Sequence, residues 1–175
     1  MSGQMSVIAA AFLIPLALII SYYDVCYRRI PNPFVLATLI VGVVVNAFFG
    51  GFNGALASVA GCALAFALMF VLHIFGAMGA GDVKLFAAIG SITGAHLVLP
   101  TFIVVALTGG VLGVFSMIRA GQMKSTMIRV FQILVGLLPG NTIPRFPIPV
   151  DRRHTIPYGV AITFGSLISL VIFRA

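Results

Sequence analysis

Apolar side chains occur along this chain in long, nearly continuous runs, separated by short stretches that contain glycine, proline or charged residues. The runs do not alternate between apolar and polar positions, as the strands of a membrane β-barrel would. Most of them approach the roughly 20 residues that an α-helix needs to cross a bilayer. We therefore predict an all-α integral membrane protein, a bundle of about six transmembrane helices. The expected spans are Val7–Tyr23, Phe34–Phe49, Ala55–Phe75, Asp82 to Gly94 or Leu97, Leu97 or Thr101 to Ile118, and Ile156–Phe173.

The polar stretches indicate where the helices end. Pro31 and Pro33 end the first helix and prepare the second, and the uncharged segment Gly50–Gly54 is expected to form a turn between the second and the third. Met127–Leu138 is apolar but too short to span, so we expect a short interfacial or re-entrant helix before the last span. No internal repeat is visible, and residues 1–175 are interpreted as a single transmembrane domain.

The composition excludes an ordinary soluble domain. Of the 175 residues, 61% are hydrophobic and 7% are charged, and the mean hydropathy is +1.21. The net charge of +7 does not indicate nucleic-acid binding, because the basic residues lie between apolar runs and form no surface interleaved with aromatic side chains. Cys26 and Cys62 form no CxxC pair and give no evidence for a zinc site or a disulfide. We therefore expect a lipid bilayer as the surroundings, and no metal or other cofactor.

The distribution of positive charge predicts the orientation of the bundle. With six spans, the connection 24–33, the glycine-rich stretch Gly76–Asp82 and the basic segment Arg119–His154 lie on one side of the membrane. With Lys84, which follows Asp82 by two residues, that side then carries nine of the ten Lys and Arg residues, and only Arg174 lies on the other. By the positive-inside rule the nine face the cytoplasm.

Acidic residues are the rarest chemical group in the chain, which has three Asp and no Glu. An ionisable residue in so apolar a chain indicates a functional site. Asp24 follows the first span, and Asp82 ends the stretch Gly76-Ala77-Met78-Gly79-Ala80-Gly81-Asp82. Taken singly, Asp82 could be only a helix cap, and Asp24 only a solvated residue at a helix end. Their common side of the membrane favours a joint role.

Two neighbouring carboxyl groups can hydrolyse a peptide bond. They cannot both ionise easily, so they hold one proton between them. One can then deprotonate a water molecule while the other protonates or polarises the scissile carbonyl, as in aspartic proteases. Gly79 and Gly81 would permit the turn and leave room for a substrate backbone beside Asp82.

Three motifs, in this order along the chain, resemble one known family. Asp24 is followed by Arg28-Arg29-Ile30-Pro31-Asn32. Gly79-Ala80-Gly81-Asp82, followed by Val83-Lys84, matches the GxGD motif of intramembrane-type aspartyl proteases. Ile156-Pro157-Tyr158-Gly159 opens the last span. The set resembles the type IV prepilin peptidases, and in particular the short peptidases of the Flp/Tad pilus systems. Presenilin-like proteases share GxGD, but their Pro-Ala-Leu motif is absent here.

The resemblance implies a function and a site. The function is endoproteolysis of the leader peptide of Flp-type prepilin-like substrates, which present the leader beside an apolar helix at the cytoplasmic face of the bacterial inner membrane. Asp24 and Asp82 would be the catalytic pair, and Gly79, Gly81 and Lys84 would border the approaching substrate. The larger members carry an N-terminal domain with CxxC motifs that methylates the product, and we expect neither that domain nor that activity here.

Two other functions stay open. A small proton-coupled transporter could use Asp24 and Asp82 as a relay, which would place both acids near the bilayer midplane. An inert scaffold for pilus assembly would need neither carboxylate for cleavage.

Other polar residues fit less demanding roles. Arg28 and Arg29 are expected to anchor the chain on the cytoplasmic side, with contact to the substrate as the alternative. Asn32, Tyr158 and Gly159 are expected to shape loops. Lys84 is also suited to a lipid phosphate or to modulation of Asp82. Cys26 is interpreted as a small apolar filler, and His73 as a packed or interfacial histidine. No spacing typical of metal ligands relates His96, Asp151 and His154.

Overall fold

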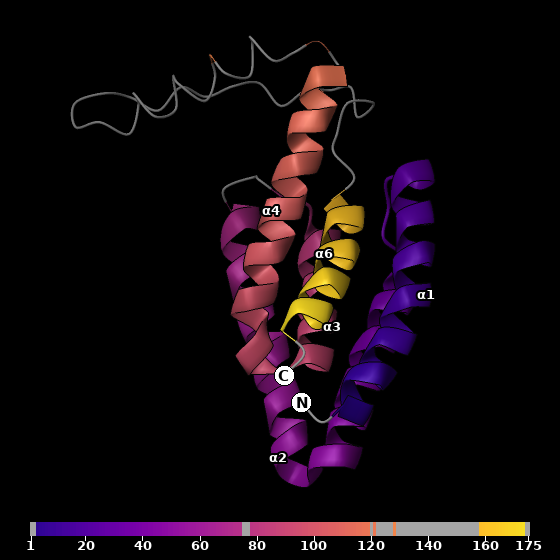
Figure 1. Cartoon of the computed structure of the whole chain (residues 1–175), viewed down its shortest axis with the longest axis vertical. Coiled ribbons are helices and arrows are strands. Elements are labelled where there is room, and N and C mark those ends of the chain that lie inside the picture. Colours follow the sequence, from indigo (N-terminus) through magenta and orange to yellow (C-terminus); the bar gives the residue numbers. More distant parts are fainter. Residues whose placement is uncertain (1–2, 75–77, 120, 122–127, 129–157, 174–175) are drawn as a thin grey trace, which may run out of the picture. The chain divides into compact units, whose positions relative to one another are not determined.

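The structure is a computed structural model that describes residues 3–74, 78–119, 121, 128 and 158–173, and every regular element in these residues is an α-helix (Figure 1). The prediction of an all-α protein is confirmed for this part of the chain. The helices are α1 (Gly3–Tyr27), α2 (Asn32–Ile74), α3 (Ala80–Thr93), α4 (Ala95–Arg119) and α6 (Tyr158–Ile172).

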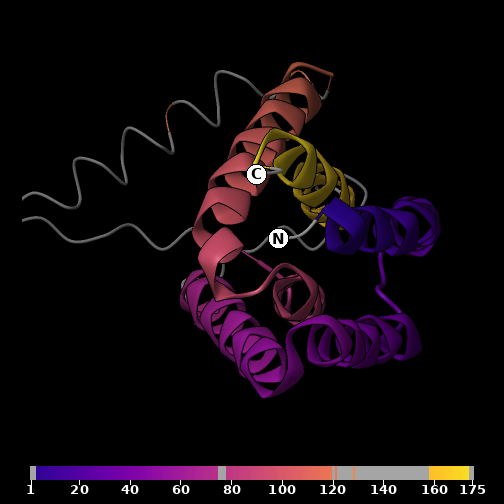
Figure 2. The same ribbon diagram turned by 60° about the horizontal axis from the view of Figure 1, so that its bottom comes forward.

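The longest helix, α2, consists of two segments, 32–50 and 52–74, that meet at Gly51. Gly51 has φ 58° and ψ −143°, a conformation that glycine adopts far more easily than residues with a side chain. Figures 1 and 2 show the chain reversing its direction within α2. The two segments come very close beside this turn, since a Cβ added to Gly54 would collide with the carbonyl oxygen of Asn46. The predicted turn between the second and third helices is therefore present.

Three of the described helices are long and apolar enough to cross a membrane: α1 over Ala10–Tyr27, α2, and α4. The kink in α2 makes it a helical hairpin, as the sequence predicts. In contrast, α3 has 14 residues and is about 21 Å long, which is shorter than the ~30 Å hydrocarbon core. A membrane protein is thus supported, whereas the count of six spans stays a prediction.

The central element of the fold is α3, which is buried without interruption from Leu85 to Thr93. Glycines allow α2 to approach it closely: a Cβ on Gly42 would lie 2.8 Å from the Ile92 nitrogen, and a Cβ on Gly90 would lie 2.6 Å from the Ala65 Cβ. Small residues at such contacts are typical of helix packing in membranes.

Side-chain hydrogen bonds tie the C-terminal end of α3 to both segments of α2. Asn46 Nδ2 donates to the carbonyl oxygens of Ser91 and Ile92 at 2.9 and 3.1 Å. From the second segment, Ser58 Oγ donates to the same Ser91 carbonyl at 2.7 Å. An interhelical bond of this kind contributes about 0.6–2 kcal/mol in a bilayer. The hairpin of α2 therefore fixes the position of α3, and with it the start of α3 at Ala80.

The last helix, α6, packs against α1 and α3. A hydroxyl pair, Thr101 Oγ1 and Ser169 Oγ at 2.8 Å, joins it to α4. Gly165 lets α6 approach α4 closely, because a Cβ there would lie 2.8 Å from the Val105 Cα. Through α6, a segment near the C-terminus reaches the ends of helices from the first half of the chain.

The chain divides into two compact units, residues 1–109 with 157–175, and residues 110–156. Among the described helices, all but the second part of α4 belong to the first unit. The short helix predicted at Met127–Leu138 falls, apart from Ile128, outside the described residues, as does most of the basic segment Arg119–His154. The single-domain interpretation stays a prediction.

Candidate active site

Asp24 lies in the last turn of α1 and is held by the opposite end of the chain. Its side chain is only 8% exposed. Its Oδ2 atom accepts the backbone N–H of Gly159, in the first turn of α6, at 2.8 Å. The carboxylate therefore sits at a helix N-terminus, where amide groups are unpaired and a negative charge is favoured.

Gly159 has no room for a side chain. A Cβ at this position would lie 2.9 Å from Asp24 Oδ2 and 3.1 Å from Asp24 Cγ, and 3.2 Å from a methyl carbon of Ile20. The absence of a side chain is what lets the first turn of α6 reach the Asp24 carboxylate. The residue is a glycine because of this close contact, not because of its backbone conformation, since its φ is not positive.

Asp82 lies in the first turn of α3, where its Oδ2 atom accepts the backbone N–H of Gly79, the N-cap residue, at 3.2 Å. The expected capping role is therefore present. A Cβ on Gly79 would lie 3.2 Å from that same oxygen, tighter than most contacts. Gly79 has φ −76°, which any residue can adopt, and Gly81 has room for a Cβ 3.6 Å from Ile30. Neither glycine has a positive φ, so the turn does not require them, and the space beside Asp82 is a structural reason for the glycine at position 79. Their role in the approach of a substrate stays a prediction.

The two carboxyl groups lie within electrostatic reach of each other. Burial, and secondly the negative charge of Asp24, raise the pKa of Asp82 to about 6. This value applies to the start of α3, which is not among the helices long enough to span a membrane. A pair in which the charge on one member keeps the proton on the other can act as an acid and a base at once.

The connections around the pair are ordered by local bonds. Arg28 ends α1 with φ 53°, in the left-handed region, and its guanidinium lies within electrostatic reach of Asp24. His73, near the end of α2, has its Nδ1 atom 2.8 Å from the carbonyl oxygen of Met78, just before Gly79. His73 is thus a packed residue that holds the chain beside the N-cap of α3, which agrees with its expected role.

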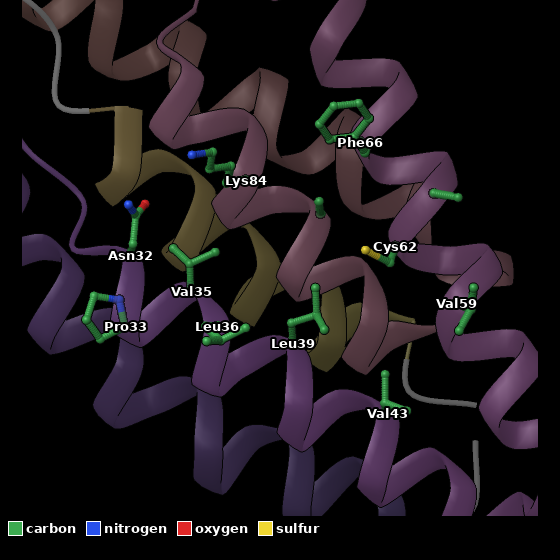
Figure 3. Close-up of a pocket in the computed structure, with 12 residues that line it drawn as sticks. Asn32, Pro33, Val35, Leu36, Leu39, Val43, Val59, Cys62, Phe66 and Lys84 are labelled. Carbon is green, nitrogen blue, oxygen red and sulfur yellow. The ribbon is translucent and has the colours of Figure 1, made fainter.

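An apolar groove of about 960 Å³ opens between the two segments of α2 and α3 (Figure 3). Its walls include Leu36, Leu39 and Val43 from the first segment, Val59, Cys62 and Phe66 from the second, and Ala87 from α3. Figure 3 places Asn32 and Lys84 together at one end and Val43 and Val59 at the other. Because Lys84 follows Asp82 by two residues, the polar end of the groove lies at the Asp82 end of α3.

The cysteines and the possible metal ligands have no observed part in this pair. Cys26 is exposed, so its interpretation as an apolar filler is wrong, whereas Cys62 is half-buried in the apolar groove. The described residues contain no group of three potential metal ligands. Asp151 and His154 lie outside them.

The residue that sequence reasoning missed is Gly159. The sequence favours a loop-shaping role for Gly159, but the residue lies within the first turn of α6 and contacts Asp24. A glycine in the first turn of an apolar helix is a weak signal of close approach. Its partner, 135 residues away, cannot be identified from spacing.

The pKa of Asp82 predicts its reactivity with an apolar carbodiimide, which modifies protonated carboxyl groups. Labelling of Asp82, followed by peptide mass spectrometry, should decrease as the pH rises through about 6. Asp24→Asn removes the neighbouring negative charge, so the pKa of Asp82 falls and labelling should disappear at a lower pH. Cys26→Ser, an exposed change in the same turn of α1, should leave the titration unchanged. An unchanged titration in Asp24→Asn would show that the two carboxyl groups do not interact.

Comparison with known proteins identifies the family. Residues 11–114 match the model of the type IV leader peptidase family, and this range contains Asp24 and Asp82 but not Gly159. No curated protein and no solved structure matches the chain. The matched range covers more than half of the 175 residues. The chain belongs to the type IV leader peptidase family.

Proposed function

We propose that this chain is a membrane-embedded aspartyl endopeptidase that removes the leader peptide of Flp-type prepilin-like substrates, with Asp24 and Asp82 as its catalytic pair. The family supports leader peptidase activity. The observation that carries the aspartyl assignment is the pairing of the two acids, in which the charge of Asp24 raises the pKa of Asp82. Both acids lie at helix ends, which favours a site near the membrane surface over a relay at the bilayer midplane.

The proposed reaction uses one water molecule and the proton of the pair. One carboxylate accepts a proton from water as the water oxygen bonds to the scissile carbonyl carbon. The other carboxyl group gives its proton to the carbonyl oxygen. The tetrahedral intermediate then breaks its C–N bond, the departing nitrogen takes the proton that came from water, and one hydroxyl proton of the intermediate returns to the carboxyl group that acted as the acid, which restores the pair. The sum is hydrolysis of one peptide bond.

The approach of the substrate is supported by the exposure of the N-terminal turn of α3. Gly79 and Ala80 are exposed, and Gly81 is half-buried, so backbone beside Asp82 is accessible. We assign Gly79, Gly81 and Lys84 to this approach. The substrate's scissile bond would reach the pair along the backbone of this turn.

We place the pair on the cytoplasmic side of the bacterial inner membrane. This is supported by Arg28 and Arg29 after Asp24 and by Lys84 after Asp82, because cytoplasmic connections are rich in basic residues. The two α2 segments begin at Asn32 and end at Ile74, near the connections that carry the acids, and the turn at Gly51 lies at their opposite end. We therefore expect this turn on the opposite side of the membrane.

Cysteine labelling in intact cells tests this side. Cys26 is exposed and lies two residues after Asp24, so in a Cys62→Ser background it should resist an impermeant thiol reagent until the cells are opened. Asn53→Cys, at an exposed position beside the Gly51 turn, should react in intact cells once Cys26 and Cys62 are replaced by Ser. The reverse pattern of labelling would overturn the orientation.

Substitution of either acid tests the catalytic pair. Asp24→Asn and Asp82→Asn keep the size of the side chain but remove a group that can ionise. Each should reduce cleavage of a co-expressed prepilin-like substrate, seen as a mobility shift on a gel, by at least about 10³-fold. The double variant should be no worse than either single one, because the two groups act as a unit.

The control for these variants is Asp151→Asn, which removes the remaining acid and should cleave normally. Each variant should also accumulate in the membrane at the wild-type level, which separates lost chemistry from lost folding. Processing at the wild-type rate by Asp24→Asn or Asp82→Asn would contradict the assignment and leave a transporter or scaffold as the better function.

The apolar groove is the surface that we assign to the substrate's apolar helix. Its polar end, at Asn32 and Lys84, lies beside the start of α3, and its small residues Cys62, Ala63 and Ala87 would let another helix approach closely. A helix seated there would bring the segment before it to Asp82. The charged residue that lines this groove, Lys84, lies at the polar end, where we expect the substrate to leave the hydrocarbon.

A matched pair of substitutions tests the groove. Ala63→Phe would fill it, whereas Ala60→Phe adds the same side chain at an exposed position of the same segment outside it. With a full-length substrate in vesicles, Ala63→Phe should raise KM at least about fivefold, and Ala60→Phe should leave KM unchanged. A peptide that spans the cleavage site but lacks the apolar helix should be cleaved equally by both. Equal KM values for both variants on the full-length substrate would exclude the groove as its seat.

A further inference from the structure

We propose that the first turn of α6 makes Asp24 the charged member of the pair and leaves the shared proton on Asp82, and that Gly159 is the positioning residue for this division. The inference rests on the proposed function, because it assigns the base and the acid within the same catalytic pair.

Burial of Asp24 disfavours its negative charge, and three neighbouring groups stabilise that charge. The Gly159 amide donates to its Oδ2 atom at 2.8 Å, and the Val160 amide also acts on the carboxylate as a hydrogen-bond donor. Both groups belong to the N-terminal end of α6, which carries a partial positive charge. Hydrogen bonds to an ionised acceptor are about twice as strong as bonds between neutral groups. The positive charge of Arg28 acts in the same direction.

The surroundings of Asp82 stabilise a negative charge less than those of Asp24 do. Its carboxyl group accepts one longer bond, 3.2 Å, from the Gly79 amide. The charged group that acts on it is the Asp24 carboxylate, which disfavours a second negative charge. The raised pKa of Asp82, about 6, agrees with this difference. The proton of the pair therefore belongs on Asp82.

This asymmetry assigns the two catalytic roles. Asp24, ionised, takes the proton from the attacking water, and Asp82, protonated, gives its proton to the carbonyl oxygen of the substrate. The arrangement depends on Gly159, since a Cβ there would press against Oδ2 and Cγ of Asp24. A larger residue would separate the carboxylate from the α6 amides, and the division of charge would be lost.

Carbodiimide labelling of the wild-type protein tests the division without any substitution and without cleavage activity. At about pH 6, Asp82 should be modified several-fold more than Asp24, because the α6 amides and Arg28 favour the charged form of Asp24 and the proton of the pair stays on Asp82. Equal labelling, or stronger labelling of Asp24, would overturn the inference even if the protein cleaves prepilin. The expected labelling in a protein that cleaves no prepilin would refute the proposed function instead.

Two alanine substitutions in α6 test the positioning role. Gly159→Ala should allow labelling of Asp24, lower kcat at least about tenfold with little change in KM, and shift the acid limb of the pH–rate profile to higher pH. Gly165→Ala is the matched control, because its Cβ would intrude to 2.8 Å from the Val105 Cα, away from Asp24. It should lower thermal stability but keep the wild-type labelling and pH profile. If both variants changed the profile alike, or if Gly159→Ala left labelling unaltered, Gly159 would have no positioning role.

Discussion

The placement of two carboxyl groups among apolar helices is the constraint on which this structure depends. A charged group is costly in such surroundings unless hydrogen bonds or opposite charges compensate it. Asp24 obtains compensation from the amide end of α6, and Asp82 obtains less, from a single amide of its own cap. The two acids consequently differ in their ability to hold a proton. That difference is the chemical property that the rest of the fold supports.

The helices around the pair serve to hold its parts in place. The two segments of α2 pack closely against α3 at glycine contacts, and Asn46 and Ser58 donate hydrogen bonds to backbone carbonyl oxygens of α3. This fixes the first turn of α3, and the contact of His73 with the Met78 carbonyl orders the chain just before it. On the other side, α6 packs against both α1 and α3 and supplies the amides that bind Asp24. The site is thus assembled from three helix ends.

Much of this arrangement follows from local sequence, and the rest depends on long-range contacts. The helical class, the turn at Gly51 and the positions of Asp24 and Asp82 at helix ends could be predicted, because apolar runs, glycine and rare acids are local signals. The bounds of α3 could be predicted approximately, as Asp82 to Gly94 or Leu97, although its apolar composition resembles that of a full span. The role of Gly159 could not be predicted, because it is a contact with a residue 135 positions earlier. The exposure of Cys26 likewise depends on which face of α1 is covered.

The central claim is that the two carboxyl groups activate a water molecule for direct attack on the scissile bond. A single turnover of purified protein with a prepilin-like substrate in ¹⁸O-water tests it most directly. The account predicts that one ¹⁸O atom appears in the new carboxylate of the released leader and none in the peptides that contain Asp24 or Asp82. Incorporation of ¹⁸O into either aspartate, or a covalent link between substrate and enzyme, would contradict it.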